Sequence, residues 1–292
     1  MNITADAVKQ LRERTGAGMM ECKKALVETK GDLDAAAELM RKQGLAKADK
    51  KAARVAAEGV IVLARSHDHK SAAMVEVNCE TDFVAREHDF RAFAQSVAEA
   101  ALATHATDLA ALAAARLAGG ESVEERRRAL VAKIGENIAI SRFQRYDAPN
   151  GNLLATYIHP GAQLGVMVEL SGVTANDETR EVAKDVAMQV AAVNPEFISR
   201  NDVTEAALAK EKDIARARAL AEGKPEKVVD RIVEGRMAKY YEEVCLLDQP
   251  FIKENSMSID QLLKQKAGAN ATVTRFARFK VGETQQDTPA AE

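Results

Sequence analysis

Apolar residues three and four positions apart dominate the first 55 residues, a spacing that places them on one face of a helix. Two breaks divide this pattern into three helices. The first is the run Thr15-Gly16-Ala17-Gly18, whose glycines permit a tight turn, and the second is Gly31-Asp32, where Asp32 can cap the helix that follows. We therefore predict a small bundle of three helices over residues 1–54.

The middle of the chain changes to strand spacing twice. A continuous apolar run covers 60–63 and alternating apolar residues cover 73–77, after which helical spacing takes over. The same order returns around a strand predicted at 164–170, which precedes another apolar helix. Before that strand lie a strand beginning near Ile138 and the dipeptide Asn150-Gly151, the strongest hairpin signal in the chain.

Two short sequences indicate that these two units are related. Met74-Val75-Glu76-Val77 and Met167-Val168-Glu169-Leu170 each lie on a predicted strand just before a loop and a helix. Self-similarity of this kind is typical of repeated structural units. We predict two similar antiparallel α+β core subdomains, one at 55–140 and one formed by 141–198 together with 244–264, and hence an α+β fold.

Two strongly helical stretches, about 204–221 and 226–243, flank a break at Gly223-Lys224-Pro225. We predict an antiparallel helical hairpin inserted over 199–243. Its apolar positions exceed what two helices can hide from water, so one face needs a partner. The last residues, 265–292, return to strand spacing and are predicted to form a short C-terminal module.

Composition excludes several classes of protein. Aromatic residues make up 4% of the chain with no Trp, which argues against sites that stack sugars or single-stranded bases. A net charge of −3 argues against nucleic-acid binding by bulk charge. Three widely spaced cysteines indicate neither a disulfide framework nor a zinc site, and no apolar run is long enough to cross a bilayer. Because no basic, apolar leader opens the sequence, we expect a cytoplasmic protein with no membrane partner.

Motifs for catalysis are absent from the sequence. There is no GxSxG, HExxH or phosphate-binding loop, and Gly16-Ala17-Gly18 lies between helices without the Lys-Ser/Thr that such a loop needs. His67 and His69 share a predicted surface loop, but no third metal ligand lies nearby in the sequence. These residues do not bring a nucleophile together with a base.

The segment Asn78-Cys79-Glu80-Thr81-Asp82-Phe83-Val84-Ala85-Arg86 follows a buried strand and precedes a helix. In one interpretation Thr81 or Asp82 caps that helix, and Phe83 and Val84 are core residues. In the other, Phe83 is displayed as an apolar wedge beside a carboxylate, on a loop held by a rigid scaffold. The sequence alone leaves both open.

Two further functions stay open on the residues alone. A nucleic-acid adaptor could use 41–54, which carries six basic residues and Asp49 for a net charge of +5, together with Arg126-Arg127-Arg128. An enzyme could use Cys79 with Glu80 or Asp82, although no histidine lies close in sequence to activate the thiol.

Six sequences of this chain resemble motifs of the bacterial elongation factor Ts family, in the family's order. They are Leu11-Arg12-Glu13-Arg14-Thr15-Gly16-Ala17-Gly18-Met19-Met20-Glu21-Cys22-Lys23-Lys24-Ala25-Leu26, the segment from Asn78 to Ala85, Ala132-Lys133-Ile134-Gly135-Glu136-Asn137, Asn194-Pro195-Glu196-Phe197, Glu234-Gly235-Arg236-Met237 and Gln249-Pro250-Phe251. The resemblance covers nearly the whole chain. It departs at His159-Pro160-Gly161-Ala162, where the family commonly has glycine directly after the histidine.

The resemblance implies a non-enzymatic guanine-nucleotide exchange factor, with no cofactor of its own, for elongation factor Tu, the GTPase that delivers aminoacyl-tRNA. It also implies that 1–54 is a ubiquitin-associated-like domain, that 199–243 is a dimerisation arm and that the C-terminal module contacts the GTPase. Asp82 would disturb the partner's Mg²⁺ site while Phe83 separates two of its helices. The residues that the resemblance assigns to partner binding are Arg12, Met19, Met20, Thr81, Asp82, Phe83, Val84 and His159.

Overall fold

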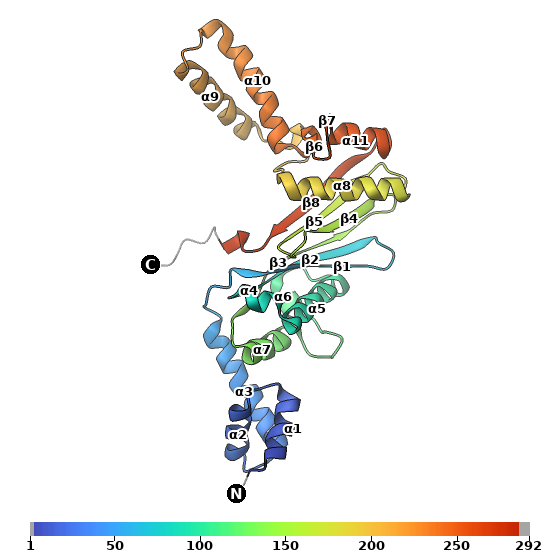
Figure 1. The fold of residues 1–292 in the computed structure, drawn as a ribbon. Coiled ribbons are helices and arrows are strands. Elements are labelled where there is room, and N and C mark those ends of the chain that lie inside the picture. The colour runs from blue at the N-terminus through green and yellow to red at the C-terminus, as the bar shows by residue number, and fades with distance from the viewer. Residues whose placement is uncertain (1–2, 286–292) are drawn as a thin grey trace.

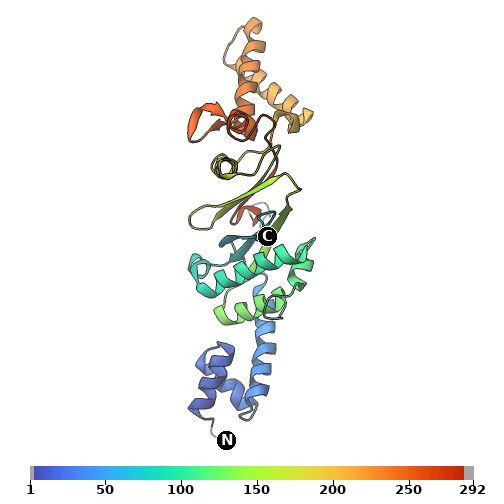
Figure 2. The ribbon, with the colours of Figure 1, turned by 90° about the vertical axis from the view of Figure 1, so that its right-hand side faces the viewer.

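The computed structural model describes residues 3–285, and the end of the predicted C-terminal module, 286–292, lies outside the described residues. The molecule is elongated, with a helical bundle at one end, a helical hairpin at the other and two small sheets between them (Figures 1 and 2). Helices and antiparallel sheets occupy separate stretches of the chain, so the predicted α+β class is confirmed.

The bundle consists of α1 (Ala5–Thr15), α2 (Met19–Glu28) and α3 (Leu33–Lys51). Both predicted breaks are present: Gly16 ends α1 with a φ of 67°, and the Asp32 side chain accepts backbone N–H bonds from the first turn of α3. The three-helix prediction is therefore confirmed. The bundle core is small, with fully buried side chains such as Leu11, Cys22 and Leu26.

The basic stretch 41–54 is a docked helix rather than a free linker. The second half of α3 packs against α7 (Val123–Ile134), where Ala48 joins the core of the first sheet. Lys51 donates to the carbonyl oxygen of Gly135 just beyond that helix. The expected boundary at residue 54 is thus displaced, because small residues on both helices allow a close contact that charge alone did not indicate.

The first sheet contains β1 (Glu58–Arg65), β2 (Ser71–Cys79) and β3 (Ile138–Asp147), in the order β1-β2-β3. All its pairings are antiparallel. Between β2 and β3 the chain forms α4 (Asp82–Arg86), α5 (His88–Thr104), α6 (Leu109–Ala114) and α7. Helices α5 and α7 cover one face, and their apolar side chains form one cluster with those of β2 (Figure 1).

The second sheet contains β4 (Leu153–Ile158), β5 (Leu164–Ser171) and β8 (Thr272–Lys280), in the order β4-β5-β8. Helix α8 (Asp177–Val193) covers its outer face (Figure 1). Between α8 and β8 the chain forms the short helices η1 (Arg200–Asp202) and η2 (Leu246–Asp248), the hairpin helices α9 (Glu205–Ala221) and α10 (Glu226–Val244), the strands β6 (Pro250–Phe251) and β7 (Glu254–Ser258), and α11 (Ile259–Lys266). A last short helix, η3 (Glu283–Gln285), follows β8.

The inner faces of the two sheets pack against each other. Met74 and Tyr146 of the first sheet meet Met167 and Phe279 of the second in a buried cluster. The sheets approach closely at Gly165, where an added Cβ would lie 2.6 Å from Ile61 Cγ2, so only glycine fits there. The core of the molecule therefore has a helix, sheet, sheet, helix layering.

Strand pairing differs from the sequence prediction in two places. Asn150-Gly151 joins β3 of the first sheet to β4 of the second instead of closing a hairpin within one sheet. Strand β8 completes the second sheet instead of belonging to a separate C-terminal module. Alternating apolar residues indicate which face of a strand is buried, but they do not indicate which strand lies beside it.

The two related strand sequences hold matching buried ion pairs. Glu76 on β2 is fully buried and accepts from Arg142 Nε on β3 at 2.7 Å. Glu169 on β5 accepts in the same way from Arg275 Nε on β8 at 2.8 Å. The repeat of Arg142-Phe143-Gln144-Arg145-Tyr146 as Arg275-Phe276-Ala277-Arg278-Phe279 is visible in the sequence, and our sequence analysis missed it.

Each of these arginines also reaches across to the other sheet. The Arg142 guanidinium lies 4.2 Å from the Phe279 ring centre and donates to the carbonyl oxygen of Lys280. Arg275 lies 4.1 Å from the Tyr146 ring centre and donates to the carbonyl oxygen of Asp147. The two sheets are therefore joined by a symmetric pair of cation–π contacts in addition to apolar packing.

The hairpin helices α9 and α10 bury a single stripe between them. Val229, Val233 and Met237 are hidden against Ala215 and Ala219. The sequence predicts more apolar positions than two helices can hide, but Val229 and Val233 are buried within the hairpin. The large apolar side chains that remain about half exposed are Ile214, Leu220 and Val228.

Candidate protein-binding site

The candidate site lies at the end of β2, where the chain leaves the first sheet. Thr81 is the N-cap of α4, and its hydroxyl oxygen accepts from the backbone N–H of Val84 at 3.4 Å. Helix α4 has only five residues, and the extended residue Glu87 separates it from α5. We call residues 81–84 the Phe83 turn.

Phe83 and Val84 have opposite environments in this turn. The Phe83 side chain is 78% exposed, whereas Val84 is buried in the cluster under the first sheet. The interpretation that both residues belong to the core is therefore wrong for Phe83 and right for Val84. Val84 anchors the turn from below and is 7% exposed, so its predicted contact with a partner would involve only a small part of its side chain.

Asp82 lies beside Phe83, and its carboxylate group is at the surface. Its Oδ2 accepts from Arg86 Nη2 at 2.8 Å, and the aspartate side chain is 44% exposed. Ion pairs of this exposed kind contribute little to stability, so Asp82 can exchange Arg86 for another cationic partner at small cost.

The loop at 135–137 forms hydrogen bonds with the start of the Phe83 turn. Glu136 accepts from the backbone N–H and from the hydroxyl group of Thr81, at 3.0 and 2.7 Å. In return, Glu80 accepts from the backbone N–H of Asn137 at 2.6 Å. Sequence analysis placed Glu136 in a family motif without a role, because 55 residues separate it from Thr81.

Arg12, Met19 and Met20 lie on the bundle near the turn between α1 and α2. All three are exposed, with 66% of Met20 in contact with solvent. The turn approaches Lys133 of α7, since an added Cβ at Gly16 would lie 3.3 Å from Lys133 Cε. Lys133 in turn pairs with Asp89 at the start of α5, the helix that follows the Phe83 turn.

His159 lies in the loop between β4 and β5, on the second sheet. It is exposed, and its Nδ1 lies 3.0 Å from the Tyr157 hydroxyl oxygen. The next two residues, Pro160 and Gly161, form the centre of a turn closed by the Ala162 N–H and the His159 carbonyl oxygen, with a Gly161 φ of 95°. Proline is favoured at the first central position of such a turn, so Pro160 fixes the loop rather than distorting it.

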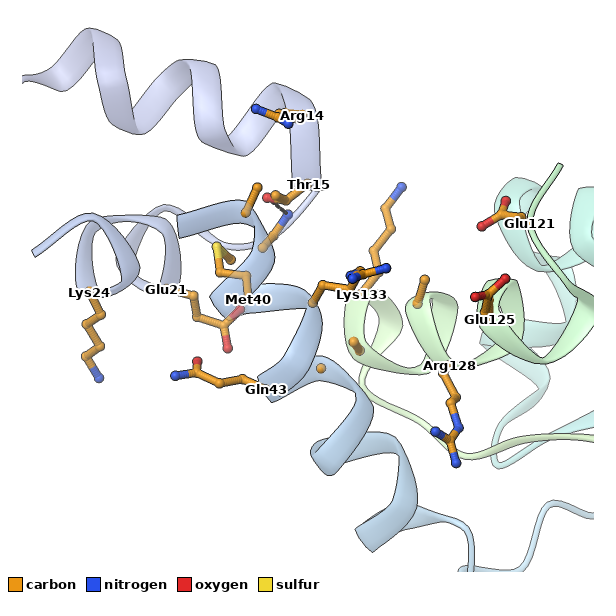
Figure 3. Close-up of a pocket in the computed structure, with 16 residues that line it drawn as sticks. Arg14, Thr15, Glu21, Lys24, Met40, Gln43, Glu121, Glu125, Arg128 and Lys133 are labelled. Atoms are coloured by element: carbon orange, nitrogen blue, oxygen red, sulfur yellow. Dashed lines mark hydrogen bonds between the residues drawn. The ribbon is translucent and has the colours of Figure 1, made fainter. Parts of the chain in front are cut away.

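A cavity of about 590 Å³ is lined by residues of α2, α3 and α7, where the bundle meets the first core subdomain. Its lining carries charges of both signs, including Glu21 and Lys24 of α2 and Glu125 and Arg128 of α7 (Figure 3).

The structure argues against a nucleophilic role for Cys79. The side chain is buried at the end of β2, and this burial, together with the nearby Glu136 carboxylate, raises the pKa of the thiol to about 12. A thiol of this kind stays protonated and unreactive at neutral pH. Residues 3–285 contain no cluster of three or more His, Cys, Asp or Glu side chains placed to hold a metal ion.

Several of the basic residues considered for nucleic-acid binding form ion pairs with neighbouring carboxylates. Arg127 and Arg128 both pair with Glu124, and Arg126 lies 3.5 Å from Glu121. Arg54 at the end of the basic stretch lies near Glu80. Guanidinium groups that are paired with carboxylates attract a phosphate backbone only weakly.

No helix within residues 3–285 combines the length and the apolar character that crossing a membrane requires.

An exposed aromatic ring on a braced turn, on an elongated scaffold of small sheets and helices, is typical of a protein that acts by binding another protein. The sequence model of the family described as Elongation factor TS matches residues 80–283. Proteins named elongation factor Ts from Clostridium perfringens (strain SM101 / Type A), Halorhodospira halophila (strain DSM 244 / SL1) and Methylococcus capsulatus are 51%, 53% and 51% identical. The matches cover 96%, 98% and 100% of this chain and 93%, 94% and 97% of those proteins. The chain belongs to the elongation factor Ts family, and its role is in translation elongation.

Proposed function

We propose that this protein is a guanine-nucleotide exchange factor that binds elongation factor Tu with bound GDP and promotes GDP release without catalysing a chemical reaction. The observation that carries the proposal is the 78% exposure of Phe83 beside Asp82 on a braced turn, within the family's signature sequence. The cytoplasm, where translation takes place, is the expected compartment, and we propose neither nucleic acid nor membrane as a partner.

The proposed mechanism depends on differential binding. A GTPase holds GDP through contacts to its phosphates and through Mg²⁺, which neutralises their charge. A factor that binds the nucleotide-free GTPase more tightly than the GDP-bound form must weaken GDP binding by the same ratio. Phe83 would separate two helices of the GTPase, and Asp82 would leave Arg86 and disturb the hydrated network around Mg²⁺.

The remaining parts have proposed roles as well. The α1–α3 bundle, a ubiquitin-associated-like domain in this proposal, would contact the GTPase through Arg12, Met19 and Met20, and His159 would contact it from the second sheet. The two sheets with their helices would be similar core subdomains. Release of labelled GDP from purified elongation factor Tu, with and without this protein, tests the central proposal, and an unchanged release rate would refute it.

We expect removal of residues 1–40 to weaken complex formation with elongation factor Tu while leaving the melting temperature of the core nearly unchanged. This deletion keeps the second half of α3, whose Ala48 packs into the first sheet's core. Removal of 1–54 would expose that surface, so we expect it to lower the melting temperature as well. Binding and melting curves of both variants check this, and equal melting temperatures for the two would contradict it.

We propose that the hairpin of α9 and α10 is a dimerisation arm, supported by Ile214, Leu220 and Val228, which remain about half exposed. Replacing 204–243 by a short Gly/Ser linker should therefore halve the sedimenting mass while GDP release is retained. Analytical ultracentrifugation measures this. A full-length protein that sediments as a monomer at high micromolar concentration would contradict the proposal.

A further inference from the structure

We propose that Glu136 is a positioning residue for nucleotide exchange: its carboxylate fixes the Phe83 turn in the orientation that engages the GTPase. This inference rests on the proposed exchange function. The Glu136 carboxylate binds both the backbone N–H and the hydroxyl group of Thr81, at 3.0 and 2.7 Å. Thr81 is the N-cap of α4, so Glu136 holds the residue at which the turn begins.

The Phe83 turn depends on such a support because its own structure is weak. A helix of five residues is marginal in isolation, because the conformational entropy lost in forming the first turn exceeds the free energy gained from its few hydrogen bonds. The Phe83 ring is mostly in solvent and does not stabilise the turn by packing. Val84 and Ala85 anchor one side by burial, which leaves the Thr81 end to be fixed by Glu136.

The support is reciprocal and reaches the N-terminal bundle. While Glu136 binds the Thr81 N–H, Glu80 binds the Asn137 N–H at 2.6 Å, so each loop supplies a carboxylate to the other's backbone. The Asn137 side chain donates to the Arg54 carbonyl oxygen at 2.7 Å, just beyond α3. The loop at 135–137 therefore connects two regions that the proposed function assigns to the GTPase.

Cys79 provides a reporter of this arrangement that does not depend on exchange activity. Its thiol is buried directly behind the turn, with Sγ 3.2 Å from the Thr81 carbonyl oxygen. Cys22 in the bundle and Cys245 beyond α10 are also fully buried, so they serve as internal controls in the same molecule. Movement of the Thr81 end should expose Cys79 to alkylation while the other two cysteines stay protected.

The experiment compares Glu136→Ala with Glu136→Gln. The alanine removes both bonds to Thr81, and loss of charge-assisted bonds of this strength corresponds to an effect of about tenfold or more. We expect GDP release from elongation factor Tu to slow by about tenfold, and Cys79 alkylation, followed by peptide mass spectrometry, to accelerate by a similar factor. Glutamine can still accept from the Thr81 N–H and donate to its hydroxyl oxygen, so it should retain most of both properties.

The glutamine variant also separates geometry from charge. Glu136 contributes to the raised pKa of Cys79, and both substitutions remove that charge, but only alanine removes the bonds. Glu178→Ala, at an exposed carboxylate on α8 that lies 3.7 Å from Lys266, is the surface control and should change neither readout.

Three outcomes would overturn the proposal: wild-type GDP release in Glu136→Ala, continued protection of Cys79 in that variant, or exposure of all three cysteines together, which would indicate general unfolding. Combining Glu136→Ala with Phe83→Ala should add little to the loss caused by Phe83→Ala alone, because both act through the same ring. If Phe83→Ala itself leaves GDP release unchanged, the exchange function fails, while Cys79 alkylation still decides whether Glu136 holds the turn.

Discussion

Phe83→Ala is expected to slow GDP release from elongation factor Tu by about ten- to a hundredfold while leaving this protein's melting temperature nearly unchanged. The ring is 78% exposed in the free protein, so its removal costs little folding stability. Burying an aromatic side chain in a partner contributes a few kcal/mol, and each 1.4 kcal/mol corresponds to about tenfold. Stopped-flow release of labelled GDP and a thermal melt measure the two quantities.

Phe90→Ala is the matched control. Phe90 lies on α5 and is fully buried in the apolar cluster of the first sheet, whereas Phe83 is exposed. That substitution should cost about 3–5 kcal/mol of folding stability through the cavity it leaves. Asp82→Ala should slow release less than Phe83→Ala, since it disturbs a hydrated ion rather than a packed contact. A normal release rate in Phe83→Ala would remove the central residue from the mechanism.

The helices of this fold could be predicted closely from the sequence, because spacing and caps are both local. Asp32 caps the helix that it was expected to cap, and Gly16 ends α1 in the left-handed conformation. Strand pairing could not be predicted as well. The alternation near Ile138 correctly indicated β3, but its neighbour β2 lies about 60 residues earlier in the chain, and no local pattern identifies it.

The candidate site was predictable only in part, for a similar reason. A lone exposed Phe and a lone buried Phe look alike in sequence, so the two interpretations of Phe83 could be separated only by the direction in which α4 leaves β2. Glu136 was quoted in a motif without its role, since the contact with Thr81 is set by how two distant loops meet. The repeated arginines Arg142 and Arg275 were visible as a pattern, but the buried glutamates they pair with follow from strand register.

A stability effect as large as that of Phe90→Ala is expected at one of these arginines. Arg142→Met should lower the free energy of unfolding by about 3–5 kcal/mol, because removing one partner of a buried ion pair leaves the other charge uncompensated. Glu76 is fully buried, and its partners besides Arg142 among residues 3–285 are neutral donors, Asn78 and the backbone of Gly282. Denaturant unfolding of the variant against wild type measures the loss.

Removing the charge of the Glu76 carboxylate, which has lost its arginine partner, tests this explanation. In the double variant Arg142→Met with Glu76→Gln, the amide carries no charge and can still accept from Gly282, so part of the lost stability should return, although the amide NH₂ group then lacks an acceptor where Arg142 stood. Lys264→Met removes an exposed ion pair with Asp260 and should change stability by less than about 1 kcal/mol. If the double variant is no more stable than Arg142→Met, the loss comes from the cation–π contact with Phe279 and from packing between the sheets, and the buried charge is not its cause.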